Sequence, residues 1–235
     1  MSDMKTFWDR RADEDAFFFV DNRLDYRHPD LEQFWAEGER DLDRLLGALD
    51  VEIHDDERVL EIGSGVGRLT RVIAARAASV LALDVSERML EIAKRHHQSL
   101  TNVKWILGDG STLRGIDSSS VDACISHVVF QHIPDAGITL GYVREIGRVL
   151  RPGGWAAFQI SNDPRVHEPP SLATRARNSV RSLIRKVPKG QHDARWLGSM
   201  VEIEDLRLAA ADGSMTIERL LGEGTQFCLV LTRRA

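Results

Sequence analysis

The sequence predicts an α/β protein, a Rossmann-like, doubly wound sheet with helices on both faces. Three observations predict this fold. Short apolar segments of strand length alternate with segments whose apolar residues keep helical spacing. One strand ends in a glycine-rich turn, and the chain closes with two strands joined by Gly222-Glu223-Gly224. Because alternating strands and helices form parallel sheets, we expect a mostly parallel sheet to which the hairpin adds one antiparallel strand.

Length and composition limit the classes of protein to which the chain can belong. The chain has 235 residues, of which 43% are hydrophobic and 29% are charged, as in an ordinary globular domain. No apolar run approaches the roughly 18 residues that span a bilayer, and the N-terminus lacks the apolar core of a signal peptide. Two distant cysteines, Cys124 and Cys228, make neither a disulfide framework nor a zinc site. We expect a cytoplasmic protein without membrane contact or metal, and the net charge of −5 disfavours a protein that coats nucleic acid.

The predicted elements follow one another along the chain. Helices come first, because Leu42, Leu45, Leu46 and Leu49 keep helical spacing. Strands are expected at residues 58–62, 80–83, 103–107, 121–126, 155–160, 215–221 and 226–232. Apolar residues at helical spacing indicate connecting helices over residues 69–77, 86–95, 135–150 and 201–208.

Capping residues mark the ends of two of these helices. Ser86 can cap a helix that carries Glu87 in its first turn and basic residues near its end, the polarity that the helix dipole favours. Asp135 starts the next long helix, and Pro152-Gly153-Gly154 is expected to stop it.

The glycine-rich turn after the first strand is the most specific local feature. It reads Glu61-Ile62-Gly63-Ser64-Gly65-Val66-Gly67 and opens a helix, whose unpaired N–H groups would face a ligand. A dinucleotide loop needs a third glycine where this chain has Arg68 or Thr70, and a Walker loop needs Gly-Lys-Ser/Thr. The spacing therefore favours a different ligand, and the alternative is a tight turn that binds nothing.

Two carboxylates follow the next strands. Asp84 ends the second strand and Asp109 ends the third, within Gly108-Asp109-Gly110. Ligands of parallel sheets sit beyond the carboxyl ends of the strands, so these side chains could accept from ribose hydroxyls and from an adenine amino group. The alternative for each is a loop carboxylate that caps a helix.

Together these stretches resemble the class I S-adenosylmethionine-dependent methyltransferases, in the branch that acts on small molecules. The resemblance is carried, in family order between residues 59 and 160, by VLEIGSGVGRLT, LALDVSERML, WILGDG, DACISHVVFQHIP and REIGRVLRPGGWAAFQI. It implies a sheet of seven strands whose last-but-one strand is inserted antiparallel. It also implies S-adenosylmethionine as the methyl donor, with S-adenosylhomocysteine as the product and no metal.

The resemblance further assigns donor-binding residues by position. The methionine half would lie along Glu61, Gly63, Ser64, Gly65 and Gly67. The ribose and adenine would meet Asp84, Val85, Met89, Asp109 and Gly110, and the site would be closed by His127 and Val128.

The chemistry of methyl transfer determines which catalytic groups the site would need besides the donor-binding residues. Transfer from a sulfonium is an in-line displacement, so a general base is needed only for a weakly nucleophilic acceptor such as a hydroxyl. His132, which follows the fourth strand, is the catalytic base candidate, and the alternative is a histidine that hydrogen-bonds its own loop. His167 and His192 are weaker candidates. The fourth strand is not followed by the Asn/Asp-Pro-Pro-aromatic motif of DNA amino-methyltransferases, which disfavours that subclass.

Two segments outside the core can cover the site. The N-terminal stretch with Phe7-Trp8 and Phe17-Phe18-Phe19 either packs on the core or forms an aromatic lid. A basic insert over residues 161–200 follows the fifth strand and carries a predicted helix over residues 172–187. As a cap, it would favour an acceptor with a carboxylate or phosphate, and the alternative is a solvated basic helix.

We therefore predict one methyltransferase domain over residues 1–235. Its parts are a helical cap (1–50), a donor-binding core (51–160), the basic insert (161–200) and a final helix with the hairpin (201–235). The predicted reaction is methyl transfer from S-adenosylmethionine to an oxygen or nitrogen of a small-molecule acceptor. The rival hypotheses are an RNA or protein methyltransferase that docks through the insert, and a non-catalytic donor-binding subunit.

Overall fold

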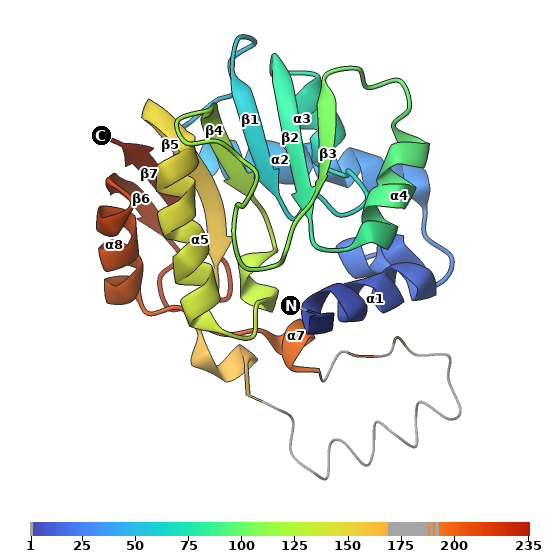
Figure 1. Ribbon diagram of the computed structural model, residues 1–235. Coiled ribbons are helices and arrows are strands. Elements are labelled where there is room, and N and C mark those ends of the chain that lie inside the picture. Colours follow the sequence, from blue (N-terminus) through green and yellow to red (C-terminus); the bar gives the residue numbers. More distant parts are fainter. Residues whose placement is uncertain (1, 169–187, 189, 191–192) are drawn as a thin grey trace.

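A seven-stranded sheet forms the centre of the computed structural model, which describes residues 2–168, 188, 190 and 193–235 (Figure 1). Its strands are β1 (Arg58–Ile62), β2 (Ser79–Asp84), β3 (Val103–Leu107), β4 (Val121–Ser126), β5 (Leu150–Ile160), β6 (Met215–Leu221) and β7 (Cys228–Arg234). Their order in the sheet is β3-β2-β1-β4-β5-β7-β6. The first five strands pair in parallel, and β7 pairs antiparallel with both β5 and β6. This confirms the predicted mostly parallel sheet, with its one antiparallel strand last but one.

The fifth strand begins earlier than the sequence predicts. Pro152-Gly153-Gly154 does follow the end of a helix, yet it lies inside β5, which starts at Leu150. Leu150 pairs with Val121, and the register between β4 and β5 then shifts before Trp155 pairs with Ala123. Gly153 has a φ of 80°, a conformation that glycine adopts freely, so the glycines absorb an irregularity within one strand.

Helices and short 3-10 turns connect the strands. The helices are α1 (Ser2–Val20), α2 (Leu31–Leu49), α3 (Thr70–Ala74), α4 (Glu87–His96), α5 (Ala136–Val149), α7 (Ala194–Leu197) and α8 (Ile203–Asp212). The 3-10 turns are η1 (Phe130–His132) and η2 (Pro164–Val166). Ser86 and Asp135 cap α4 and α5 as expected, since each side-chain oxygen accepts from a backbone N–H of the first turn. The helix predicted over residues 172–187 lies outside the described residues.

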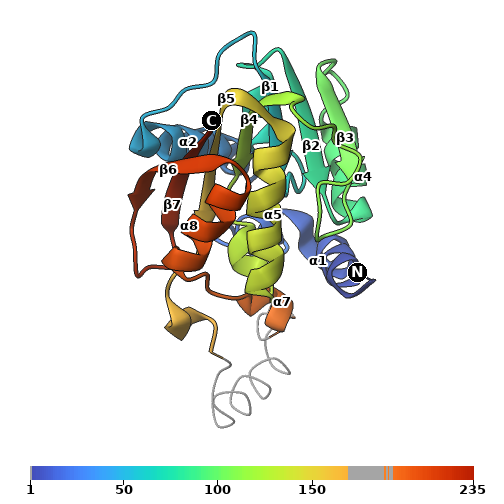
Figure 2. The ribbon, with the colours of Figure 1, turned by 60° about the vertical axis from the view of Figure 1, so that its left-hand side comes forward.

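Helices cover both faces of the sheet. Apolar residues of α5 and α8 pack with Leu60, Cys124 and Phe158 into one core, and Figure 2 shows these two helices side by side. Leucines of α2 and the apolar side of α3 pack with Val59 and Ala157 into a second core. In the part of the chain that the structure describes, no helix is long and apolar enough to cross a membrane.

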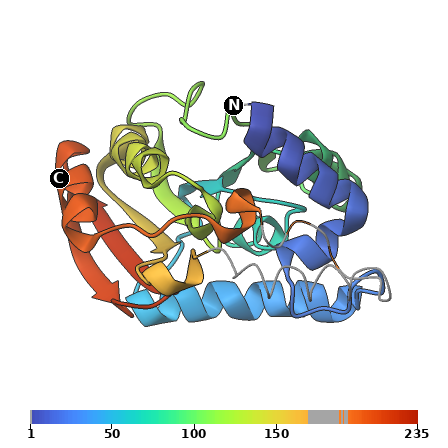
Figure 3. The same cartoon turned by 90° about the horizontal axis from the view of Figure 1, so that it is seen from below.

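The N-terminal helix lies across one end of the sheet rather than on a face. In Figure 1, α1 and α7 lie below the strands, and Figure 3 shows both of them from that side. The helical path of α1 is broken at Asp15, which is extended, and Asp15 accepts from the N–H of Phe18 to restart the helix. A third cluster joins Ala12 and Ala16 of α1 to Phe34 of α2 and Met89 of α4. This packing fixes α1 next to the loops that follow β1 and β2.

Candidate active site

A pocket lies where α1 meets the carboxyl ends of β1, β2 and β4. It contains about 1020 Å³ of space, part of it open to solvent. Its lining includes these residues assigned from the sequence: Glu61, Gly63, Ser64, Gly65, Asp84, Val85, Met89, Gly110, His127, Val128 and His132. The fold therefore brings most of the predicted site residues into one place.

The glycine loop forms the floor of the pocket. Gly63, Gly65 and Gly67 have φ values of 78°, 54° and 86°, so all three adopt a conformation that favours glycine. A side chain at Gly63 would put its Cβ 2.3 Å from Val129, and one at Gly67 would meet His97 at 2.6 Å. The N–H groups of Gly63 and Ser64 donate to the Leu83 carbonyl, 2.7 and 3.0 Å away. The loop is thus a fixed turn into which larger residues do not fit.

Asp84 ties the glycine loop to the end of β2. Its Oδ2 accepts from the N–H of Gly65 at 2.8 Å, and its Oδ1 accepts from the N–H of Ser86 at 2.8 Å. Burial raises the pKa of Asp84 to about 6, although the two backbone N–H groups oppose this shift. A carboxylate oxygen can accept more than one hydrogen bond, so Asp84 keeps acceptor capacity toward the pocket.

Glu61 is a second buried carboxyl group in the same pocket. Burial raises its pKa to about 7, and the nearby Asp84 adds to the shift, while a hydrogen bond from Thr70 opposes it. The Thr70 hydroxyl donates to Glu61 Oε2 at 2.5 Å. Two buried acids in one pocket favour a ligand that brings hydrogen-bond donors or positive charge.

Several buried polar atoms in the pocket wall have no hydrogen-bond partner among the residues that the structure describes. Ser64 Oγ, Arg68 Nε and His127 Nδ1 are buried without a hydrogen bond, and all three residues line the pocket. Buried polar groups are almost always satisfied, so these atoms indicate a polar ligand. Together with the glycine floor and the two acids, they fit the amino-acid and ribose parts of S-adenosylmethionine.

The loop after β4 carries backbone strain at the pocket. Val128 has a φ of 57°, which is rare for a β-branched residue, and it lies between His127 and Val129. Strained backbone persists where the surrounding packing holds it, and it gathers at functional sites. Burial lowers the pKa of His127 to about 4, so its ring is neutral at pH 7.

Asp109 lies apart from the other predicted residues. Its carboxylate accepts from the N–H and hydroxyl groups of Ser111 and Thr112, and it does not line the main pocket. These hydrogen bonds outweigh the effect of burial and hold its pKa below the usual value. The geometry matches the alternative of a loop carboxylate that caps a turn, and its contact with adenine stays a prediction.

His132 has both ring nitrogens engaged. Nδ1 lies 2.6 Å from the Trp196 carbonyl, and because a carbonyl only accepts, Nδ1 carries the proton. Nε2 lies 3.2 Å from Gln131 Nε2 and accepts from that amide. Gln159 fixes the amide, since its Nε2 donates to Gln131 Oε1 at 2.5 Å. Burial lowers the pKa of His132 to about 4. The ring therefore lines the pocket as a neutral group that also holds α7 in place.

Of the weaker histidine candidates, His167 does not line this pocket. His167 Nδ1 donates to the Leu197 carbonyl at 2.5 Å, and its Nε2 accepts from the Ser161 hydroxyl at 2.7 Å. It thus fastens the end of α7 beside His132. His192 lies outside the described residues. Within the described ranges, no cluster of three or more His, Cys, Asp or Glu could hold a metal ion.

The apolar wall of the pocket comes from the N-terminal stretch, for which the sequence left packing and a lid open, and from α5, which the sequence did not assign to the site. Met4, Trp8, Phe19 and Val20 of α1 line the pocket, as does Tyr142 of α5. Trp8 contacts the rings of His132 and Trp196, with centroids 5.7 and 6.2 Å apart. The aromatic N-terminal stretch was the only sequence signal for this wall. Tyr142 gave none, because it occupies an ordinary core position of its helix.

Comparisons with known proteins agree with this geometry. Residues 60–158 match the profile of a family described as "Methyltransferase domain". Over 98 residues, 42% of the chain, it is 33% identical to demethylmenaquinone methyltransferase of Tropheryma whipplei (strain Twist), and it covers only 39% of that protein's length. It is 26% identical over 167 residues to the ubiquinone biosynthesis O-methyltransferase of Thiobacillus denitrificans, which spans 71% of the chain and 67% of that protein.

A solved structure shows the same fold. Phosphoethanolamine N-methyltransferase 1 of Haemonchus contortus, in complex with phosphoethanolamine and S-adenosylhomocysteine, superposes with a TM-score of 0.67 at 18% identity. The match covers 99% of this chain and 48% of that one. At this level of identity the similarity supports the fold alone.

Proposed function

We propose that the chain is a class I S-adenosylmethionine-dependent methyltransferase that transfers a methyl group from S-adenosylmethionine to a small-molecule acceptor, and the match of residues 60–158 to a methyltransferase domain supports this. The observation that carries the proposal is the pocket itself. A glycine floor, two buried acids and three polar atoms without a partner among the described residues line the same cavity as apolar side chains of α1. A pocket with one polar and one apolar side suits a polar methyl donor and an apolar acceptor, whose reacting atoms must come into contact.

We assign the donor to the polar side of the pocket. When bound, S-adenosylmethionine supplies an activated methyl group on a sulfonium. Asp84 would accept from the ribose hydroxyls with its remaining lone pairs, while its bonds to Gly65 and Ser86 keep the carboxylate in place. Glu61, Ser64 and Arg68 would bind the amino-acid part, and Val85 with Met89 would flank the adenine.

We assign the acceptor to the apolar side. Trp8, Phe19 and Ile133 offer aromatic and aliphatic surface, and the neutral ring of His132 brings no net charge. Such a wall favours an acceptor with an apolar or aromatic body. Both curated relatives are named for methylation in quinone biosynthesis, which supports an aromatic acceptor for this chain too.

The sequence also favoured an anionic acceptor, on the strength of the basic insert. Most of that insert lies outside the described residues, so the described wall cannot support this part of the prediction. Arg68 is the one cation among the described pocket residues, and Asp21 and Asp41 already pair with it. We therefore propose a hydroxyl or amine on a largely uncharged body as the methyl acceptor.

The protein's contribution to catalysis is mainly positioning. In-line displacement gains most from holding the two reacting atoms in contact and excluding water, and the α1 wall can do both. For a hydroxyl acceptor a base is needed, and His127 and His132 are the neutral groups placed to take the proton. His127 has the unpartnered nitrogen, whereas each nitrogen of His132 has a partner.

A methyl-transfer assay tests the proposed function. Purified protein is incubated with methyl-tritiated S-adenosylmethionine and a panel that contains phenols, hydroquinones, primary amines, carboxylates, RNA and protein. We expect label to pass to an aromatic or apolar small molecule. Transfer to RNA or protein alone would replace the proposal with a macromolecular methyltransferase. Tight donor binding without transfer to any member, beside a relative that is active on the panel, would favour a non-catalytic subunit.

A further inference from the structure

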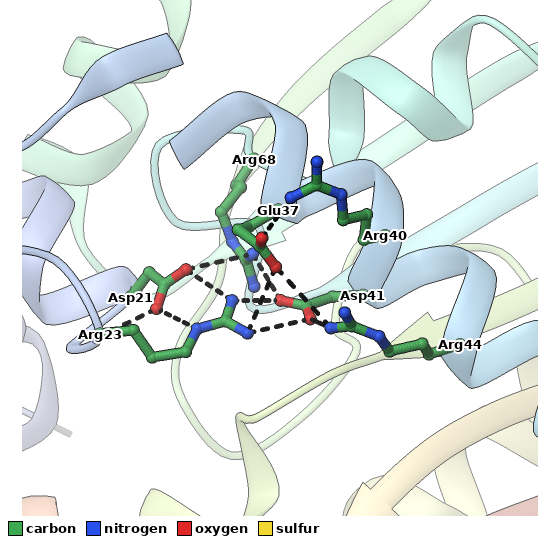
Figure 4. Close-up of polar contacts among 7 residues, drawn as sticks. All are labelled: Asp21, Arg23, Glu37, Arg40, Asp41, Arg44 and Arg68. Carbon is green, nitrogen blue, oxygen red and sulfur yellow. Dashed lines mark hydrogen bonds and ion pairs between the residues drawn. The ribbon is translucent and has the colours of Figure 1, made fainter. Parts of the chain in front are cut away.

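A buried ion-pair network joins the glycine loop to the N-terminal wall (Figure 4). Its centre is Arg68, the first residue after Gly67, whose side chain is only 6% exposed. Arg68 Nη1 lies 2.6 Å from Asp41 Oδ2 of α2 and 3.5 Å from Asp21 Oδ2, at the end of α1. One guanidinium therefore contacts α2 and the residue that follows α1, while its backbone belongs to the loop.

The two aspartates that pair with Arg68 are buried, so nearby cations must balance their negative charges. The side chains of Asp21 and Asp41 are 4% and 9% exposed. Arg23 is their second cation, and its Nη2 lies 2.6 Å from an oxygen of each. Burial opposes ionisation of Asp41, but the hydrogen bonds from Arg23 and Arg68 hold its pKa below the usual value. Arg44 also pairs with Asp41, at 3.1 Å, but Arg23 and Arg44 are 47% and 64% exposed. Arg68 is therefore the buried cation among the three arginines that pair with these aspartates.

Arg68 has little freedom to leave this position. A Cβ at Gly38 of α2 would lie 2.7 Å from Arg68 Cγ and 2.8 Å from its carbonyl oxygen, so α2 is packed directly on it. The ring of Phe34 lies beneath the guanidinium, 5.8 Å away. Arg68 also lines the pocket, and its Nε has no hydrogen-bond partner among the described residues. The arginine therefore belongs both to the pocket lining and to the ion pairs with α2 and Asp21.

We propose that Arg68 is a positioning residue that couples the glycine loop to α1, so that a ligand on the loop and closure of the α1 wall stabilise each other. Asp21 directly follows α1, and α1 supplies Trp8, Phe19 and Val20 to the pocket. The ion pair between Arg68 and Asp21 therefore restrains the C-terminal end of α1. Coupling of this kind is reciprocal, so a wall held closed also favours the ligand. The inference deepens the proposed function and rests on it only for the identity of the ligand.

Hydrogen exchange of α1 tests the coupling without an activity assay. In the free protein, we expect Arg68→Met to speed exchange of α1 by at least tenfold, with exchange of β4 unchanged. Arg68→Lys should give an intermediate rate, because an ammonium pairs with the carboxylates as a point charge rather than through a fork. The matched control is Arg76→Met. Arg76 also pairs with α2, through Asp43 at 2.7 Å, but it contacts neither Asp21 nor the pocket.

A second variant covers the case in which Arg68→Met does not fold. Asp21→Asn keeps the pair between Arg68 and Asp41 but weakens the pairs that Asp21 forms with Arg68 and with Arg23, so it should also speed α1 exchange. Unchanged α1 exchange in folded Arg68→Met and Asp21→Asn would overturn the proposal. Equal effects of Arg76→Met and Arg68→Met would overturn it as well, because they would show a general loosening of α2.

The ligand arm uses S-adenosylhomocysteine as the probe. We expect a saturating amount to slow α1 exchange in the wild type by several-fold and to slow it much less in Arg68→Met. If it binds both proteins and slows α1 equally, the coupling is refuted. A failure of the wild type to bind S-adenosylhomocysteine would refute the proposed function instead, and the ligand-free comparison would still decide whether Arg68 holds α1.

Discussion

The two sides of the pocket are built in different ways. The strand-end side consists of backbone turns and buried acids that lie close together in the sequence, such as the loop from Glu61 to Gly67 and Asp84. The α1 side consists of side chains that come from distant segments, and Trp8 and Trp196 meet there although 188 positions separate them (196 − 8). The first side is specified by local geometry and the second by tertiary packing. We therefore expect substitutions on the two sides to affect different ligands.

The largest expected effect is on the strand-end side. Asp84→Ala removes the proposed acceptor of two ribose hydroxyls, and we expect a loss of about 2–4 kcal/mol in affinity for S-adenosylhomocysteine, because hydrogen bonds to charged groups are worth about 1.5–3 kcal/mol each and do not add fully. That is roughly a 30-fold to 1,000-fold weaker dissociation constant by calorimetry. Asp84→Asn, which keeps the shape, should lose less. An unchanged constant in folded Asp84→Ala would place the ribose elsewhere.

The matching substitution on the other side is Trp8→Ala. It removes an aromatic wall residue, and central aromatic residues of binding sites contribute about 2 kcal/mol or more, so we expect the KM for the acceptor to rise roughly 30-fold. Affinity for S-adenosylhomocysteine should stay within about threefold, since Trp8 belongs to the side that we assign to the acceptor. Trp8→Phe is the control that keeps an aromatic ring. Equal losses for both ligands would remove the distinction between the two sides.

The same difference explains what could be predicted from the sequence. Strand length, helix spacing and the caps at Ser86 and Asp135 are local signals, and the structure confirms those elements. The positions of Gly63, Asp84 and Gly110 around one pocket followed because the carboxyl ends of parallel strands meet at one edge. The start of β5 was misplaced, because a proline and two glycines usually end structure and here fit an irregular strand.

The unpredicted parts depend on which side chains tertiary packing brings together. Nothing local to Asp21, Asp41 or Arg68 indicates that the three meet, because each is an ordinary charged residue of an amphipathic segment. The interpretation of Asp109 as an adenine ligand depended on its place after β3, yet its oxygens bond within their own turn. Short-range hydrogen bonds of this kind compete with ligand binding and leave no trace in residue spacing.

Replacing His132 distinguishes a structural role of its ring from a role as general base. Both ring nitrogens have protein partners, so we expect His132→Gln to lower kcat/KM by about tenfold through a displaced α7 and Trp196, with donor affinity kept. A general base would instead cost about 10²–10⁴ in turnover. A loss in that larger range, with a matching change in the low-pH limb of the rate profile, would return His132 to the catalytic role.

Affinity for the donor should also depend on pH, because two buried acids lie on the strand-end side. Burial raises the pKa of Asp84 to about 6 and of Glu61 to about 7, so in the free protein these groups bind protons as the pH falls below 7. A ligand that needs the ionised acids should therefore bind more weakly below pH 7, by up to about tenfold per pH unit for each proton released. We expect calorimetry with S-adenosylhomocysteine between pH 5.5 and 8 to show this loss. An affinity that rises toward low pH would contradict it.

The same shifts predict the opposite trend for stability. Between pH 4 and 7 these two carboxyl groups hold more protons in the folded protein than in the unfolded chain, so they lower the free energy of unfolding as the pH rises. Replacing Glu61 by Gln should flatten that part of the curve in denaturant titrations. A profile that is equally steep in wild type and Glu61→Gln would show that other groups set it.

Calorimetric titration with S-adenosylhomocysteine tests the central claim most directly, namely that the strand-end side alone carries the donor. Wild type, Asp84→Ala and Trp8→Ala are titrated in parallel, with NAD as the control ligand. The account predicts one saturable site in the wild type, severe loss in Asp84→Ala, near-normal binding in Trp8→Ala and no response to NAD. Binding of NAD without binding of S-adenosylhomocysteine, or equal binding by wild type and Asp84→Ala, would contradict it.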